Sequence, residues 1–244
     1  MDFSDIAVAV AGLFLAGIVK GATGLGYSSC ALPFLTAAVG LRHAIVLVVF
    51  PAMSANIAVM WSAGHFRETL QRFAPFYIAT IPGLCLGIFG LSGADQKYTE
   101  LVLGVLIVTY SIYSGFRPDL TLPVRYQTVL QLPAGLLNGF FTGLTGSQVF
   151  PLLPYMISLK LDPDRFVQAV NISVTISAGM MAIALLVSGM MTLPGLAMSS
   201  LSIIPAMIGI TLGTRIRRRL PTAHFRIIVL IILGILGLAL IIRH

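Results

Sequence analysis

The chain has 244 residues, of which 57% are hydrophobic and only 9% are charged, and its formal net charge is +7. Its mean hydropathy of +0.98 lies far outside the range of soluble domains, in which about a quarter of the residues are charged. The sequence therefore predicts an integral membrane protein. It argues against a nucleic-acid partner, because the basic residues stand at the ends of apolar segments, where they orient a chain in the bilayer.

The apolar segments are about as long as a helix that crosses a bilayer, roughly 20 residues. Residues 1–5 carry acid where a secretory signal would carry lysine or arginine, so we expect the first segment to remain part of the fold. No period-two alternation favours strands, and an all-α polytopic membrane protein is predicted. The apolar runs are about Ile6–Val39, Ala44–Ala63, Phe73–Leu91, Tyr98–Phe116, Thr128–Ser158, Phe166–Val187, Leu193–Gly213 and Phe225–Ile242.

Two of these runs are interrupted by stretches rich in glycine and hydroxyl side chains, Gly17–Cys30 and Gly139–Gln148. Shifted by 122 positions, they share the pattern Gly-x-x-x-Gly-x-Thr-Gly. We interpret the chain as two repeats, 1–119 and 120–244, within a single integrated membrane domain. Each repeat is predicted to be a broken helix pair, re-entrant or spanning, followed by three transmembrane helices, with the two repeats inverted.

The length of the broken segments favours re-entry. Ile6–Val39 would measure about 51 Å as a continuous helix, against ~30 Å for one hydrocarbon core and ~60 Å for two. Half-helices over about 6–19 and 26–39, and over about 128–141 and 147–158, would fit.

The placement of lysine and arginine agrees with re-entry, because positive residues concentrate on the cytoplasmic side of membrane proteins. If the broken segments return to their own side, eleven basic residues face the cytoplasm, against nine when all eight segments cross. The eleven are Arg67, Arg72, Arg117, Arg125, Lys160, Arg165, Arg215, Arg217, Arg218, Arg219 and Arg226, whereas Arg42, Lys97 and Arg243 face outward.

The breaks are also where a ligand would bind, because irregular backbone at membrane depth survives only in a protein interior or a wet cavity. We expect a half-helix to start after each break, which points free N–H groups and a positive helix end at the centre. Hydroxyl and amide donors join them, and the preferred ligand is a small anion. The candidate substrate-binding residues are Lys20, Gly21, Thr23, Gly24, Gly26, Ser28, Ser29, Asn138, Gly143, Thr145, Gly146, Ser147, Gln148 and Asn171.

Acidic and metal-binding residues give the complementary expectation. All eight Asp and Glu residues fall in loops or at segment ends, so no carboxylate is expected within a span to hold a cation. Cys30 and Cys85 have no metal-ligand spacing, and the histidines stand at segment ends. Neither a metal site nor a cofactor is predicted.

The stretch from Gly17 to Phe34, repeated from Gly139 to Met156, resembles the sulfite exporter TauE/SafE family over essentially the whole chain. The resemblance implies a multi-pass protein of the bacterial inner membrane that moves sulfite, thiosulfate, sulfoacetate or a related organosulfonate. Gly21, Thr23 and Gly24, and Gly143, Thr145 and Gly146, match the repeated signature. Lys20, whose equivalent is Thr142, departs from the symmetry of the repeat.

Three alternatives stay open. An anion channel could use the same site. A membrane-embedded enzyme is disfavoured because the sequence lacks a catalytic motif such as HExxH or Gly-x-Ser-x-Gly. A scaffold subunit would not explain the two breaks. The expected partners are a small anionic substrate and the lipid bilayer, and the sequence leaves a homo-oligomer open.

Overall fold

The computed structural model describes residues 3–24, 26–116, 121–217 and 222–242, and these form helices without any strand. The side chains of residues 3–5, 62–63, 217 and 222–229 are not part of this description. The predicted all-α membrane fold is confirmed. The boundary expected at 119/120 and the side chains of Arg117, Arg218, Arg219 and Arg243 lie outside the described residues.

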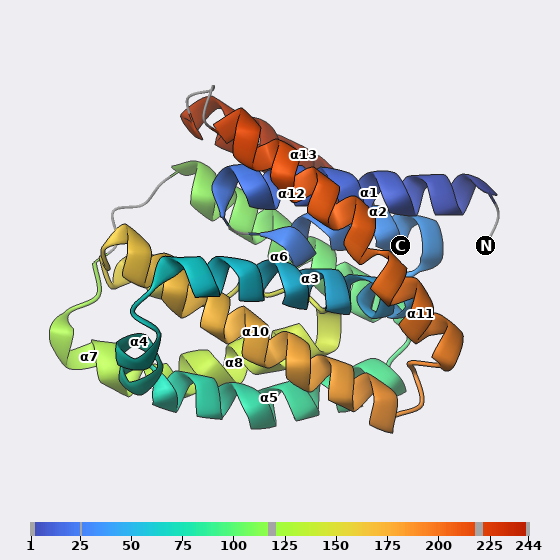
Figure 1. Ribbon diagram of the computed structural model, residues 1–244. Coiled ribbons are helices and arrows are strands. Elements are labelled where there is room, and N and C mark those ends of the chain that lie inside the picture. Colours follow the sequence, from blue (N-terminus) through green and yellow to red (C-terminus); the bar gives the residue numbers. More distant parts are fainter. Residues whose placement is uncertain (1–2, 25, 117–120, 218–221, 243–244) are drawn as a thin grey trace.

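The first half contains α1 to α6 and the second half α7 to α13 (Figure 1). The first set is α1 (Phe3–Thr23), α2 (Tyr27–Val39), α3 (Leu41–Ala63), α4 (Phe66–Arg72), α5 (Ala74–Gly93) and α6 (Gln96–Phe116). The second set is α7 (Val124–Val129), α8 (Gln131–Thr145), α9 (Leu152–Ser158), α10 (Pro163–Val187), α11 (Leu193–Leu201), α12 (Ile203–Arg217) and α13 (Thr222–Ile242).

Six helical segments of the described chain are long and apolar enough to cross a bilayer. They are Ile6–Thr23, Leu41–Trp61, Ala74–Gly93, Gln96–Phe116, Pro163–Val187 and Leu193–Ile216, the last combining α11 and α12. Many of their large apolar side chains, such as Phe89 and Val187, are exposed. Such a surface suits lipid rather than water.

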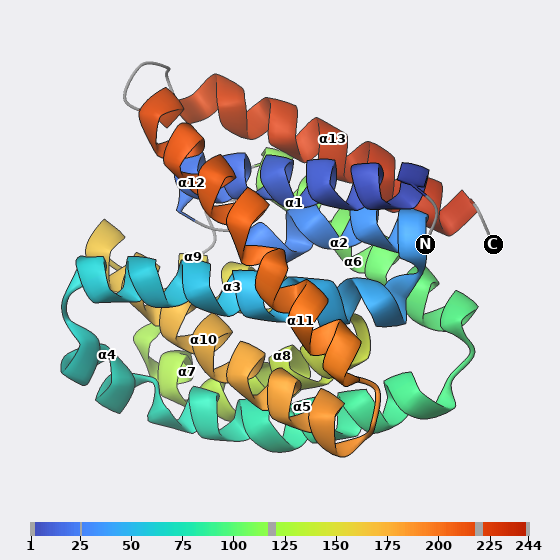
Figure 2. The same ribbon diagram turned by 45° about the vertical axis from the view of Figure 1, so that its right-hand side comes forward.

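The first broken segment folds as a hairpin. α1 runs to the break and α2 packs back along it, so that a Cβ on Gly12 would touch Phe34 and Leu35. Figure 2 shows α2 returning toward the end of the molecule where α1 begins. At the turn, Gly24 and Gly26 both have a φ of 79°, which favours glycine because a side chain would be strained there.

The half-helix bounds differ from the expected ones. α1 continues to Thr23 rather than ending near residue 19, whereas α2 begins and ends as predicted. In the second half α8 ends at Thr145, Gly146 takes a φ of 74°, and α9 begins only at Leu152. The expectation of a helix start directly after Gly146 is therefore wrong. Residues 147–149 have irregular backbone, and Pro151 lies just before the seven-residue α9.

Equivalent helices of the two halves pack in equivalent ways. α1 packs along α12 as α8 packs along α5, and α3 pairs with α10 and α6 with α13. Figures 1 and 2 show α1, α12 and α13 at one side of the molecule and α5 and α8 at the other. This pairing is what two related repeats would produce. Their inverted orientation in a membrane stays a prediction.

Glycines make the two long interfaces close. A Cβ on Gly17 would collide with the Ala206 carbonyl oxygen, and one on Gly139 with that of Thr80. The facing glycines Gly83, Gly87, Gly209 and Gly213 are equally crowded by backbone atoms. Small residues let helices approach in lipid, where packing rather than the hydrophobic effect drives association. Gly83 with Gly87 and Gly209 with Gly213 therefore form packing faces between helices.

One acidic residue departs from the expectation for carboxylates. Glu100 is the fifth residue of α6, inside a candidate span, and only 3% of its surface is exposed. Its Oε1 accepts from the Leu41 backbone N–H (3.3 Å) and from Gln96 Nε2 (2.7 Å). Glu100 therefore ties the start of α6 to the start of α3.

Candidate functional site

The first feature of the site is a buried lysine between two asparagines. Lys20, in the last turn of α1, is 3% exposed. Its Nζ donates to Asn56 Oδ1 on α3 (2.5 Å) and to Asn171 Oδ1 on α10 (2.8 Å). Three helices that are distant in sequence thus converge on one amine.

The two amides are held in a fixed orientation. Asn56 Nδ2 donates to the Ala52 carbonyl at 2.6 Å, and Asn171 Nδ2 donates to the Val167 carbonyl at 2.7 Å. Because each amide nitrogen is bonded to the preceding turn of its own helix, each amide oxygen must face Lys20. The same arrangement, an amide nitrogen bonded to its own helix and an amide oxygen bonded to Lys20, therefore occurs on α3 and on α10.

No acidic residue balances this lysine in the described structure. Positions 44–60 of α3 and 166–187 of α10 contain neither Asp nor Glu. The ion pairs of the described chain include a surface cluster of Glu68, Asp162 and Arg165, which joins α4 to the start of α10. Buried charges in proteins are normally paired, whereas the hydrogen-bond acceptors of Lys20 in the described structure are the two amide oxygens.

The two breaks meet beside the lysine. Ser29 Oγ, in the first turn of α2, lies 3.4 Å from Ser147 Oγ in the irregular segment after α8. Thr145 stabilises that segment, because its hydroxyl accepts from the Ser147 backbone N–H at 3.2 Å and donates to the Phe141 carbonyl at 2.7 Å. The stretches Gly17–Cys30 and Gly139–Gln148 therefore meet at these side chains.

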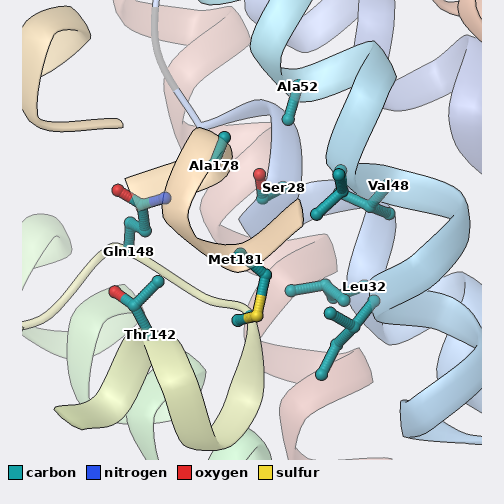
Figure 3. A pocket seen from close by; sticks show the side chains of 11 residues that line it. Ser28, Leu32, Val48, Ala52, Thr142, Gln148, Ala178 and Met181 are labelled. Atoms are coloured by element: carbon teal, nitrogen blue, oxygen red, sulfur yellow. The ribbon is translucent and has the colours of Figure 1, made fainter. Parts of the chain in front are cut away.

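Two small cavities lie at this meeting point. One, of about 30 Å³, is lined by Lys20, Gly26, Ser28, Ser29, Asn56 and Gln148, among others. The second, of about 20 Å³, shares Ser28 and Gln148 and adds Thr142, Gly146 and Met181 (Figure 3). In Figure 3 the amide nitrogen of Gln148 lies on the side of Ser28. Each cavity is about the size of one or two water molecules.

A larger cavity adjoins the lysine cavity, with which it shares Gly26, Ser29, Val149 and Leu153. Its volume is about 280 Å³, and Tyr110, Ile157 and Phe166 line it farther out. Ile157 and Phe166 lie close in sequence to Lys160 and Arg165, at the end of α9 and the start of α10. In the other direction the 20 Å³ cavity is bounded by apolar Leu32, Ile45 and Met181. The site thus adjoins a wide cavity on one side and packed apolar side chains on the other.

Some of the predicted site residues line a cavity and others do not. Lys20, Gly26, Ser28, Ser29, Gly146 and Gln148 line the two small cavities, Thr23 lines the larger one, and Asn171 holds Lys20. Gly21 and Gly143 lie instead against the backbone of α12 and α5. Ser147 contacts Ser29, Thr145 holds the second break, and a Cβ on Gly24 would meet nothing within 4 Å.

Asn138 is fully buried, and neither of its amide atoms has a hydrogen-bond partner in the described structure. It precedes Thr142 by one turn, and the backbone carbonyl of Asn138 accepts from the Thr142 hydroxyl at 2.6 Å. Gln148 Oε1 is likewise buried without a partner in the described residues. Polar groups of this kind are expected to meet water or a ligand.

The candidate residues predicted from the sequence did not include Asn56, Thr142 or Tyr27, which line the two small cavities. An asparagine within an apolar span was the available signal for Asn56. Its direction toward Lys20 depends on how α1 and α3 pack.

The comparisons with known proteins agree with this architecture. The sequence model of the family described as sulfite exporter TauE/SafE matches residues 9–240, almost the entire chain. No curated protein and no solved structure matches the chain. The chain is a multi-pass membrane protein, and by this match it belongs to the sulfite exporter TauE/SafE family of transporters.

Proposed function

We propose that the protein is a secondary transporter that moves a small sulfur-containing anion across the cytoplasmic membrane of a bacterium. The substrate class is sulfite, thiosulfate, sulfoacetate or a related organosulfonate. The observation that carries the proposal is Lys20, a buried lysine without an acidic partner in the described structure, next to a cavity where the two breaks meet.

The anion would bind between Lys20 and the polar groups of both breaks. Ser28 and Ser29 lie in the first turn of α2, where backbone N–H groups lack partners within the helix, and Gln148 adds an amide from the second half. The second break offers no helix N-terminus to the anion, because no helix begins directly after Gly146 and α9 begins only at Leu152.

Transport would require the site to open alternately to the two sides. The two small cavities hold about one or two waters, so they must widen around an anion of several atoms. The cavity of about 280 Å³ gives a route toward the side that carries Lys160 and Arg165, which the positive-inside rule makes cytoplasmic. The apolar contacts of Leu32, Ile45 and Met181 would then close the outer route.

Counterflow in proteoliposomes tests the function. Vesicles loaded with unlabelled thiosulfate should accumulate labelled thiosulfate transiently, and sulfite and sulfoacetate should compete. Lys20→Met should lower the rate at least about tenfold, because a hydrogen bond to a charged group contributes ~1.5–3 kcal/mol. Lys97→Met, at an exposed lysine of the opposite end, is the matched control and should leave the rate unchanged.

The same experiment separates the alternative functions. An anion channel would show flux without acceleration by unlabelled anion on the far side. An enzyme is disfavoured by membership of a transporter family. The proposal would be refuted if thiosulfate uptake showed no counterflow, no competition by sulfite or sulfoacetate, and the same rate in Lys20→Met as in the wild type.

A further inference from the structure

The geometry around Lys20 fits two protonation states. A neutral lysine amine has two N–H donors and one lone pair, whereas the ammonium has three donors. The oxygens of Asn56 and Asn171 satisfy two donors in either state. The third position on Nζ is the one left for the cavity that Lys20 lines, and it is a lone pair in one state and an N–H in the other.

Few titratable groups surround this amine. Positions 44–60 of α3, 166–187 of α10, 203–214 of α12 and 230–242 of α13 contain no ionisable residue. α2 contributes Cys30 and Tyr27, and Tyr27 lines the same cavity with its hydroxyl buried and unpartnered in the described structure.

Lys20 is the charged side chain among the described residues that line this cavity. Arg215, at the end of α12, is exposed, and Glu100 bonds the Leu41 backbone N–H at the opposite end of α3 from Asn56. Lys20 is therefore the residue whose charge can respond to an anion in the cavity.

Proton binding and anion binding must be linked at such a site. An ammonium buried without a negative partner is costly, and an anion beside it removes much of that cost. By linkage, the anion then favours the proton on Lys20 and the proton favours the anion equally.

We propose that Lys20 is the proton-coupling group of the transporter, so that one proton travels with each anion. When the anion enters, a proton from water adds to the Nζ lone pair and the new N–H donates to the anion. When the anion leaves, that N–H bond breaks and the proton returns to water on the other side. No electron is transferred. This inference rests on the proposed function, which it extends to the coupling ion.

Isothermal titration of the full-length protein in detergent tests the proposal. Thiosulfate is the probe, because it stays ionised near neutral pH and takes up no proton itself. Titrations in buffers of different ionisation enthalpy, between about pH 6 and pH 9, give the number of protons bound per anion. The wild type should take up nearly one proton per thiosulfate at the alkaline end.

Substitutions of the lysine sharpen the result. Lys20→Arg, which stays charged at any of these pH values, should take up no proton when thiosulfate binds. Lys20→Met, the second variant if arginine does not fit, should show neither strong binding nor proton uptake. Lys97→Met should behave as wild type. Thermal unfolding of each variant checks that it is folded.

The outcomes separate this inference from the proposed function. Thiosulfate binding by the wild type without proton uptake at any pH would overturn the coupling role and leave the transport function standing. Proton uptake that persists in either Lys20 variant would assign the coupling to another group. If thiosulfate, sulfite and sulfoacetate all fail to bind the folded wild type, the proposed function fails and this inference falls with it.

Discussion

Ser29 and Ser147 place their hydroxyl oxygens 3.4 Å apart, although 118 positions separate them in the chain. One belongs to the break after α1 and the other to the break after α8. Their contact joins the two halves at the small cavities that Lys20 and Gln148 line.

The first prediction concerns the charge at the site. Asn171→Asp or Asn56→Asp would place a permanent carboxylate where an amide oxygen now accepts from Lys20. The carboxylate would neutralise the lysine and compete with the substrate, so thiosulfate affinity should fall at least about tenfold. Isothermal titration measures the change.

Asn171→Leu is the matched variant, because it removes the same amide without adding charge. It should weaken thiosulfate binding less than Asn171→Asp does. Equal affinity of wild type and Asn171→Asp would show that the anion does not bind at Lys20.

The second prediction concerns the threonines of the repeated signature. Thr145→Val leaves the Ser147 N–H without its acceptor, and an unsatisfied buried N–H costs about 1–3 kcal/mol. Thr23→Val removes a hydroxyl that donates to the Val19 carbonyl of its own helix at 2.8 Å. Thr23 and Thr145 occupy the same place in the repeated pattern. Their contacts differ, and we expect the greater loss of transport for Thr145→Val.

Counterflow rates and unfolding temperatures of both variants check this order. Thr211→Val is the control, because the exposed Thr211 hydroxyl donates to the preceding turn of its own helix at 2.7 Å and lies outside the site. Normal transport by Thr145→Val would mean that the second break does not shape the site.

The third prediction concerns the glycine interfaces. Gly139→Ala would drive a methyl group into the Thr80 carbonyl, and Gly17→Ala would do the same at Ala206. Overpacking of this kind typically costs about 1–3 kcal/mol. The unfolding temperature in detergent should fall for both variants.

Gly179→Ala and Gly115→Ala are the controls, because a Cβ at either helical position would meet nothing within 4 Å. Removing a flexible glycine from a helix should leave these two proteins as stable as the wild type or slightly more so. A drop as large as that of Gly139→Ala would contradict the assignment of close packing to α5 and α8.

The fourth prediction concerns topology. If each broken segment returns to its own side, Ala37→Cys near the end of α2 should react with a membrane-impermeant maleimide only from outside. Lys160→Cys, after α9, should react only from the cytoplasm. Both positions are exposed. Labelling is read in inverted and right-side-out vesicles, in a background lacking Cys30 and Cys85.

Leu32→Cys, at a fully buried position, serves as the unreactive control. Reaction of Ala37→Cys and Lys160→Cys from the same side would rule out opposed re-entrant segments and the inverted arrangement.

The local features of the fold were within reach of the sequence. Gly24, Gly26 and Gly146 interrupt apolar runs, and each adopts a positive φ of the kind that only glycine adopts without strain. The bounds of α9 could not be predicted from the sequence, because the path of residues 147–151 depends on what packs around them as well as on local preference. Gly21 and Gly143 were predicted beside the ligand, yet they face helix backbones, since one repeated pattern serves both turns and close packing.

The membrane class, the duplicated breaks and the family could be predicted without a structure, because hydropathy and glycine spacing are properties of the chain alone. The position of Lys20 between Asn56 and Asn171 and the contact of Ser29 with Ser147 depend on the tertiary structure. These contacts join residues between 36 and 151 positions apart. The physical reason is that the direction of a buried polar side chain is set by the crossing of packed helices, which the close glycine contacts of α1 with α12 and of α8 with α5 help to fix.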